Sequence, residues 1–164
     1  MKRFFWAIVC VIIAAGLQGN LPSWLSIWGA NPDLVLVVLI AYSLAADPVF
    51  GASLGFSAGL IHGSSVGLCL GSFIVTRTIT GFLAGFVTTR LFSENPIVPV
   101  ISAMWLTFAC EMLFLFANPR PDAALVMRSV GGECILNGIF TLFVYCWLRH
   151  MESRRKLRLV NSRI

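Results

Sequence analysis

Charge is the scarcest feature of this sequence. Lys, Arg, Asp and Glu make up 12% of its 164 residues, whereas 58% of the residues are hydrophobic and the mean hydropathy is +0.87. A soluble domain typically carries about 25% charged residues, so this composition excludes an ordinary soluble globular fold. No stretch is long and polar enough to form a separate soluble domain. The sequence therefore predicts a single membrane domain over residues 1–164.

Motifs for catalysis and for metal binding are also missing. The five cysteines form no CxxC pair and no Cys/His spacing, so we interpret them as small apolar residues rather than as metal ligands. There is no HExxH motif, no P-loop and no pair of catalytic carboxylates. Ser64 and Ser65 follow His62, but no acid is placed to complete a catalytic triad. We therefore expect a protein that is not an enzyme and that needs no cofactor or metal.

Glycine, by contrast, is abundant and regularly spaced between residues 51 and 85. The glycine ladder consists of Gly51, Gly55, Gly59, Gly63, Gly67, Gly71, Gly81 and Gly85. Residues four apart share one face of a helix, and a glycine face lets another membrane helix approach closely. We expect this face to serve helix packing or the binding of a partner helix. It is not a nucleotide-binding loop, because it lacks the Walker lysine and the preceding strand.

Apolar runs separated by polar breaks predict an all-α integral membrane protein with six transmembrane helices. The expected spans are residues 4–20, 32–46, 49–62, 68–92, 97–117 and 130–148, followed by a basic tail at 149–164. The second and third spans are about 20 Å long, shorter than a membrane core of about 30 Å. They either extend into their flanks or form a shallow helical hairpin. The first apolar run lacks a small-residue cleavage site, so we expect a retained span and not a signal peptide.

The distribution of basic residues supports an even number of spans. With six spans, Lys2, Arg3, Arg90 and six basic residues of the tail face the cytoplasm, and Arg120 and Arg128 face outward. This agrees with the positive-inside rule and predicts that both termini are cytoplasmic. A five-span alternative would place the basic tail outside. Beside a last span, such a tail indicates contact with membrane lipid rather than with nucleic acid.

Four ionisable side chains are expected within or at the edge of the spans, namely Arg77, Glu111, Glu133 and His62. An unpaired arginine in mid-membrane costs about 2.5–3.5 kcal/mol, so Arg77 needs a partner, and Glu111 is the best match in depth. Such a pair fixes helix packing, shapes a surface for a partner, or belongs to a ligand site, and all three uses stay open. His62 is expected in a polar turn at 62–67, in a structural role.

Several motifs recur in a recognisable order. Asn31-Pro32-Asp33-Leu34 opens the second span, Gly55-Phe56 and Gly59-Leu60 lie in the third, a short turn leads to Gly67-Leu68, and Asn137-Gly138 lies in the last span. In order and spacing they resemble the bacterial MreD family of rod-shape-determining proteins, over essentially the whole chain. The sequence departs from the family at His62, where relatives usually carry an acidic residue.

The resemblance implies a non-enzymatic subunit of the elongasome in the bacterial cytoplasmic (inner) membrane. Such proteins bind the scaffold MreC and act with MreB, RodA and a class B penicillin-binding protein in peptidoglycan synthesis and cell-shape maintenance. The family is also similar in fold to the substrate-binding subunits of energy-coupling-factor vitamin transporters, which gives an alternative function. A vitamin-binding subunit needs a polar pocket near the outer face, whereas a scaffold subunit needs an exposed face for a partner helix.

Overall fold

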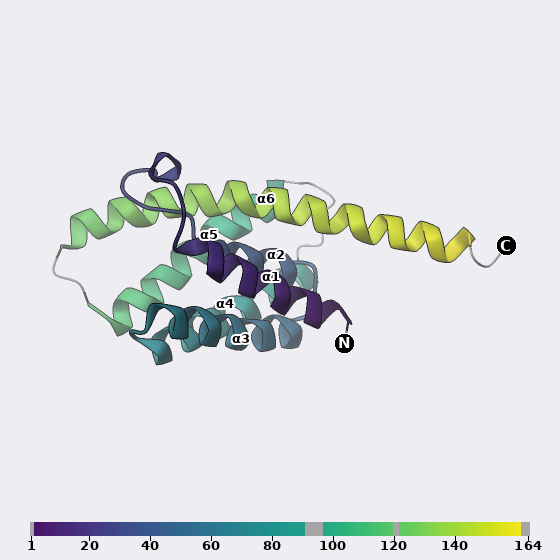
Figure 1. The fold of residues 1–164 in the computed structure, drawn as a ribbon, viewed down its shortest axis with the longest axis horizontal. Coiled ribbons are helices and arrows are strands. Elements are labelled where there is room, and N and C mark those ends of the chain that lie inside the picture. The colour runs from purple at the N-terminus through teal and green to yellow at the C-terminus, as the bar shows by residue number, and fades with distance from the viewer. Residues whose placement is uncertain (1, 91–96, 120–121, 162–164) are drawn as a thin grey trace.

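The computed structural model describes residues 2–90, 97–119 and 122–161, and over these residues the chain is helical, with one isolated two-residue bridge between Ile27 and Ala30 (Figure 1). The helices are α1 (Lys2–Gln18), the 3₁₀ helix η1 (Ser23–Leu25), α2 (Leu34–Ser43), α3 (Pro48–Val66), α4 (Leu70–Arg90), α5 (Ile97–Ala117) and α6 (Ala123–Asn161). This confirms the all-α class. Within the described residues, α3, α4, α5 and α6 are long and apolar enough to cross a membrane.

The short helix α2 lies at the centre of the bundle. It contacts each of the other five α-helices, and all of its residues from Val35 to Ser43 are buried except Val38. A helix that is apolar on every side is stable only when other elements surround it. The second predicted span is therefore a core helix of 10 residues. Its start, at Asp33, lies inside the protein.

The glycine ladder forms the contact between α3 and α4, which is the most extensive helix pair among the described elements. A Cβ at Gly51 or Gly55 would collide with the backbone carbonyl of Gly81 or Arg77, and one at Gly59 would lie 2.6 Å from the Cα of Ile74. This close approach is possible because glycine has no side chain.

Of the two uses expected for the ladder, helix packing or the binding of a partner helix, the structure shows helix packing. Gly51, Gly55, Gly59 and Gly63 are buried against α4, and Gly85 meets the backbone at the start of α3. Only Gly67 and Gly71 have open space where a Cβ would lie.

The predicted polar turn at 62–67 is wrong, because α3 continues to Val66. The hydroxyl groups of Ser64 and Ser65 donate to the carbonyl oxygen of Ile61, which satisfies them within the helix. Gly67 then ends α3 in a left-handed conformation, with φ of 73°. His62 is consequently a buried helical residue and not a turn residue.

The last helix is longer than predicted at both ends. It begins at Ala123, within the loop expected at 118–129, and continues through most of the expected tail to Asn161. Its 39 residues span about 58 Å, roughly twice the thickness of a membrane core. Figure 1 shows α6 projecting beyond the other helices at the end where both termini lie. The predicted connection at 93–96 and Arg120 lie outside the described residues.

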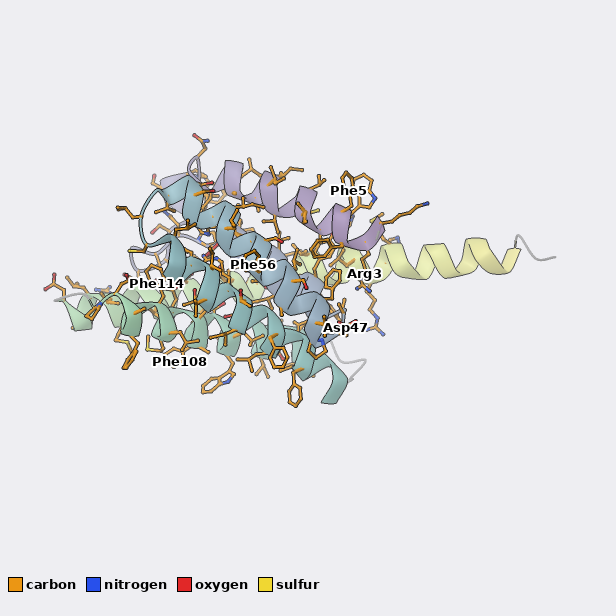
Figure 2. All side chains as sticks on the ribbon, turned by 90° about the horizontal axis from the view of Figure 1, so that it is seen from below. Arg3, Phe5, Asp47, Phe56, Phe108 and Phe114 are labelled. Carbon is orange, nitrogen blue, oxygen red and sulfur yellow. The ribbon has the colours of Figure 1, made fainter. Side chains whose placement is uncertain are left out.

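Large apolar side chains cover much of the outer surface. Figure 2 shows Phe5 and Phe56 on helices at the outside of the bundle, and these residues are 64% and 51% exposed. Exposed tryptophans lie on α1, α5 and α6, at Trp6, Trp105 and Trp147. Polar side chains such as Asn137, Thr107 and Arg77 are instead buried. Apolar residues outside and polar residues inside fit a chain surrounded by lipid.

Candidate functional site

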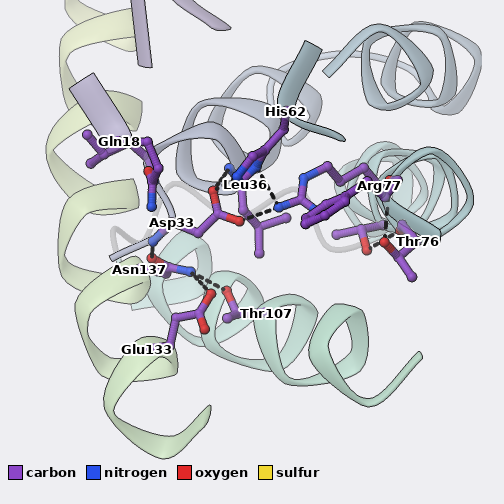
Figure 3. Close-up of polar contacts among 12 residues, drawn as sticks. Gln18, Asp33, Leu36, His62, Thr76, Arg77, Thr107, Glu133 and Asn137 are labelled. Carbon is purple, nitrogen blue, oxygen red and sulfur yellow. Dashed lines mark hydrogen bonds and ion pairs between the residues drawn. The ribbon is translucent and has the colours of Figure 1, made fainter. Parts of the chain in front are cut away.

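The candidate site is centred on Asp33, at the start of α2. The Asp33 carboxylate accepts a hydrogen bond from the backbone N–H of Leu36 at 3.0 Å and so caps the helix. The backbone N–H of Asp33 donates to the Asn137 side-chain oxygen at 2.9 Å (Figure 3). Asp33 is buried, because the helix that it caps is the central one. Its second carboxylate oxygen is available for an ion pair.

Arg77, from α4, supplies that ion pair. One terminal guanidinium nitrogen donates to Asp33 Oδ2 and lies 2.8 Å from His62 Nδ1 (Figure 3). The guanidinium carbon lies 4.6 Å from the centre of the Phe73 ring, and the side chain as a whole is only 2% exposed. Arg77 is thus a buried cation with a carboxylate, an imidazole and an aromatic ring around it.

The sequence analysis expected Glu111 as the main partner of Arg77 and did not consider Asp33. That expectation placed Asp33 near the start of the second span, which was predicted over residues 32–46. In the structure α2 begins inside the bundle, so Asp33 lies at the depth of Arg77. Glu111 lines the same cavity as both residues.

His62 is fixed in one orientation by its neighbours. Its ring stacks on Phe73 with centroids 4.9 Å apart, and its Nδ1 faces Arg77. A guanidinium group only donates hydrogen bonds, so Nδ1 must be the acceptor. The neutral ring then carries its proton on Nε2. His62 therefore serves Arg77 as an uncharged acceptor.

Polar side chains from the remaining helices hold the start of α2 in place. Gln18, at the end of α1, donates to the Pro32 carbonyl at 2.9 Å and accepts from the Leu34 N–H at 2.8 Å. Asn137 on α6 also donates to Thr107 on α5 and to Glu133, both at 3.4 Å. Each of the other five α-helices thus contributes a side chain to one polar cluster around Asp33.

The sequence analysis missed two members of this cluster, Gln18 and Thr107. Gln18 follows the first apolar run and Thr107 interrupts the fifth. A polar residue at such a position is the signal that could have identified each of them. A third missed feature is Gly132 on α6, where a Cβ would collide with the carbonyl oxygen of Ile27. The loop between α1 and α2 therefore packs directly on the backbone of α6. This contact helps to place Asn31, Pro32 and Asp33 beside Asn137.

A cavity of about 600 Å³ opens beside the cluster. It brings together the four ionisable residues that the sequence singled out, Arg77, His62, Glu111 and Glu133. Its lining consists of Gln18, Asn31, Asp33, His62, Val66, Leu68, Cys69, Phe73, Arg77, Glu111, Phe114, Asn118, Pro119 and Glu133. These residues come from the end of α1, α3 and α5 and from the beginning of α2, α4 and α6. The cavity therefore lies at the end of the bundle opposite the two termini.

The other family-motif residues lie away from this cavity. Phe56 and Leu60 are exposed on the outer side of α3, and Gly138 packs against the side chain of Met104. Pro32 contributes only its backbone carbonyl oxygen, which accepts the hydrogen bond from the Gln18 side chain. Within the described part of the chain, no group of three His, Cys, Asp or Glu residues is arranged to hold a metal ion. The cluster offers one buried ion pair and a polar cavity with donors and acceptors.

Comparison with known proteins places the chain in a family. Residues 1–152 match the family model described as rod shape-determining protein MreD. The match covers α1 to α5 and α6 up to the segment that projects beyond the bundle. No curated protein and no solved structure matches the chain. The similarity in fold to the substrate-binding subunits of energy-coupling-factor transporters therefore stays a prediction.

Proposed function

Because this chain belongs to the MreD family of rod shape-determining proteins, we propose that it is a non-enzymatic subunit of the membrane complex for cell-wall elongation. In this complex it binds an MreC-like scaffold protein and acts with MreB, RodA and a class B penicillin-binding protein in peptidoglycan synthesis. The observation that carries the proposal is the family match over residues 1–152. The four long apolar helices fit a multi-pass membrane protein of that family.

In the proposed topology all six α-helices lie in the cytoplasmic membrane and both termini are cytoplasmic. Arg3 donates to the carbonyl oxygen of Ala45, so the α2–α3 connection is at the end of the bundle that holds the N-terminus. Lys2, Arg3 and the basic part of α6 gather at this end, as the positive-inside rule requires. The cavity end, where Glu111 and Glu133 lie, then faces outward.

The proposed surface for the partner helix is the exposed apolar outside of the bundle. The buried glycines of α3 are excluded, because α4 covers them. Aromatic residues are enriched at protein interfaces, and Trp6, Trp105 and Trp147 are exposed on three different helices. Trp6 and Trp147 line one pocket between α1 and α6, and Trp105 lies on α5, so these positions sample two places at which a membrane helix of the scaffold can pack.

Site-specific photo-crosslinking in cells tests this proposal. A photoreactive phenylalanine analogue replaces Trp6, Trp105 or Trp147 in turn, and the MreC-like protein carries a tag. We expect a crosslink to the tagged protein from at least one of the three positions. Tyr42 is the matched control, because it is aromatic but buried in the central helix. Crosslinks from none of the three positions, or equal crosslinking from position 42, would contradict the proposal.

Mass spectrometry of material purified in mild detergent separates this function from the alternative. Recovery of MreC, RodA or a penicillin-binding protein supports the elongation complex. Recovery of an ATPase with its coupling subunit, or of a vitamin in stoichiometric amount, would instead indicate a transporter subunit. In that case the cavity beside Arg77 would be the substrate site.

A further inference from the structure

We propose that the groove between α1 and α6 binds one acyl chain of a membrane phospholipid. The groove is the gap lined by Trp6 and Cys10 of α1, Tyr42 of α2, and Trp147 and Met151 of α6. This inference goes beyond the proposed role in cell-wall elongation and does not depend on it. It rests on the packing of the helices, on the pairing of the polar groups in the lining, and on the size and position of the gap.

The packing of the bundle leaves this gap open. α1 and α6 each pack against α2, but among the described elements they do not pack against each other. Tyr42, near the end of α2, is buried and forms the floor of the groove, whereas Trp6 and Trp147 in its walls are about half-exposed. Protein interiors are close-packed and seldom contain a gap larger than a water molecule. A gap of about 290 Å³ on the apolar surface therefore has room for part of another molecule.

The polar side chains of the lining already have partners. The sulfur of Cys10 lies 3.4 Å from the hydroxyl oxygen of Tyr42, so these two groups share a hydrogen bond. Arg3, which also lines the gap, donates to the carbonyl oxygen of Ala45, and its guanidinium carbon lies 5.8 Å from the centre of the Phe50 ring. The other described residues of the lining are tryptophan, leucine and methionine. Water finds few hydrogen-bond partners in such a gap, so an apolar group is favoured there.

The size of the gap favours an acyl chain over a helix of a partner protein. A helix about 10 Å across fills roughly 850 Å³ in two turns, about three times the volume of the gap. The loop between α1 and α2 also runs from the end of α1 to α6, where the Ile27 carbonyl and the Trp28 ring meet Gly132 and Gly131. A helix lying along the whole groove would meet this loop, whereas an acyl chain reaches only from one membrane surface to the middle. A partner helix can pack over the rim of the groove but does not fit inside it.

The groove begins at the depth where a lipid chain leaves its headgroup. Trp6 lies near the start of α1 and Trp147 near the end of the predicted last span, and tryptophan rings settle at the level of the headgroups. Exposed apolar residues continue the two helix faces toward the middle of the membrane, with Ile13 two turns after Trp6 and Phe143 one turn before Trp147. The groove therefore leads from the membrane surface on the side of the termini toward the membrane centre. In the proposed orientation the bound lipid belongs to the cytoplasmic leaflet.

Photolabelling of the purified full chain in detergent tests the inference. The probe is a phosphatidylcholine with a diazirine in the middle of one acyl chain, and its headgroup carries no net charge. Mass spectrometry identifies the labelled residues over a series of probe concentrations. We expect saturable labelling of α1 from Trp6 to Ile13 and of α6 from Phe143 to Met151. Labelling of the remaining apolar surface should rise in proportion to the probe concentration.

Substitutions connect the labelling to the groove. Cys10→Phe places a ring in the gap and should lower the saturable labelling by at least about fivefold, because the ring and the acyl chain compete for the same space. Trp147→Ala removes one wall and should lower it by at least about threefold. Trp105→Ala is the matched control, because it removes an exposed tryptophan from α5, outside the groove. This control should be labelled like the parent.

Three results would overturn the inference: labelling of the groove that rises without saturation, equal saturable labelling around Trp105, or labelling that neither Cys10→Phe nor Trp147→Ala lowers. The first two comparisons use the parent protein, so they stand even if a variant does not fold. All of these measurements use the isolated chain. Their failure would leave the crosslinking result with the scaffold protein unaffected.

Discussion

At the scale of single residues, Asp33 has two roles, one for each oxygen of its carboxylate. It caps α2 through a hydrogen bond to the backbone of Leu36, and it is the counter-ion of Arg77. A buried ion pair adds little net stability compared with apolar packing, but removal of one partner is costly because it leaves a buried charge uncompensated. The effects of substituting Asp33 and Arg77 on the free energy of unfolding should therefore be strongly coupled.

A double-mutant cycle measures this dependence. Arg77→Met should lower the free energy of unfolding by about 3–5 kcal/mol, because the Asp33 carboxylate is left without its cation. Asp33→Asn removes the charge but keeps a side chain that caps helices well. The double variant should be more stable than the sum of the two single changes predicts, by at least about 1 kcal/mol. Reversible unfolding of the purified protein in mixed micelles gives all four values.

The same cycle with Glu111→Gln in place of Asp33→Asn serves as the comparison. Glu111 was the partner expected from the sequence, and it lines the same cavity. If the coupling of Arg77 to Glu111 exceeds its coupling to Asp33, the ion pair with Asp33 is not the dominant one.

The sequence predicted that Arg77 needs a partner, because an isolated cation within lipid is costly in any fold. It did not predict which partner. The depth of Asp33 depends on the path of the loop between α1 and α2, which Gly132 and Asn137 of α6 hold in place. Contacts more than 100 residues apart in the chain decide this path, and local patterns carry no information on them.

At the scale of helices, the glycine ladder acts by bringing two backbones together. α3 and α4 approach so closely that a Cβ at several positions would collide with main-chain atoms of the facing helix. Gly55 lies opposite the backbone of Arg77 itself. The ladder therefore also sets the position from which the Arg77 side chain reaches Asp33 and His62.

Two alanine substitutions within the ladder should have opposite effects. Gly55→Ala places a methyl group against the carbonyl oxygen of Arg77, so α3 and α4 must separate, at a cost of about 1–3 kcal/mol. Gly71→Ala is the matched control, because nothing lies within 4 Å of its Cβ position. Alanine forms helices better than glycine, so this variant should equal or exceed the parent by up to about 1 kcal/mol.

Thermal unfolding in detergent compares the two variants with the parent. The expected result is a lower midpoint for Gly55→Ala and an equal or higher midpoint for Gly71→Ala. Similar behaviour of both variants would mean that α3 and α4 do not pack as closely as the structure has them.

Helix existence was easier to predict than helix ends. Apolar runs identified the positions of all six α-helices, because burial or lipid contact requires such runs. The ends of α3 and α6 were predicted wrongly for different reasons. Ser64 and Ser65 satisfy their hydroxyl groups within α3, so polarity did not end that helix. α6 continues past the bundle into the basic segment, because no glycine or proline between Gly138 and Asn161 breaks the helix.

At the scale of the whole molecule, charge is unevenly divided between the two ends of the bundle. Asp33, Glu111, Asp122 and Glu133 lie at the cavity end together with Arg77 and Arg128, whereas Lys2, Arg3 and Arg149 lie at the end with the termini. Across a membrane this asymmetry favours one orientation, with the basic end in the cytoplasm. In the proposed orientation the cavity end faces outward.

Cysteine labelling in intact cells tests the orientation directly. Cys69 is exposed in the connection between α3 and α4, at the mouth of the cavity. When the other four cysteines are replaced by serine, a maleimide that cannot cross the cytoplasmic membrane should still label Cys69 from outside. The control carries Cys69→Ser and Ala46→Cys, which places the thiol at the end where Arg3 contacts Ala45. This control should react only after the cytoplasmic membrane is permeabilised, and the reverse pattern would mean that the cavity faces the cytoplasm.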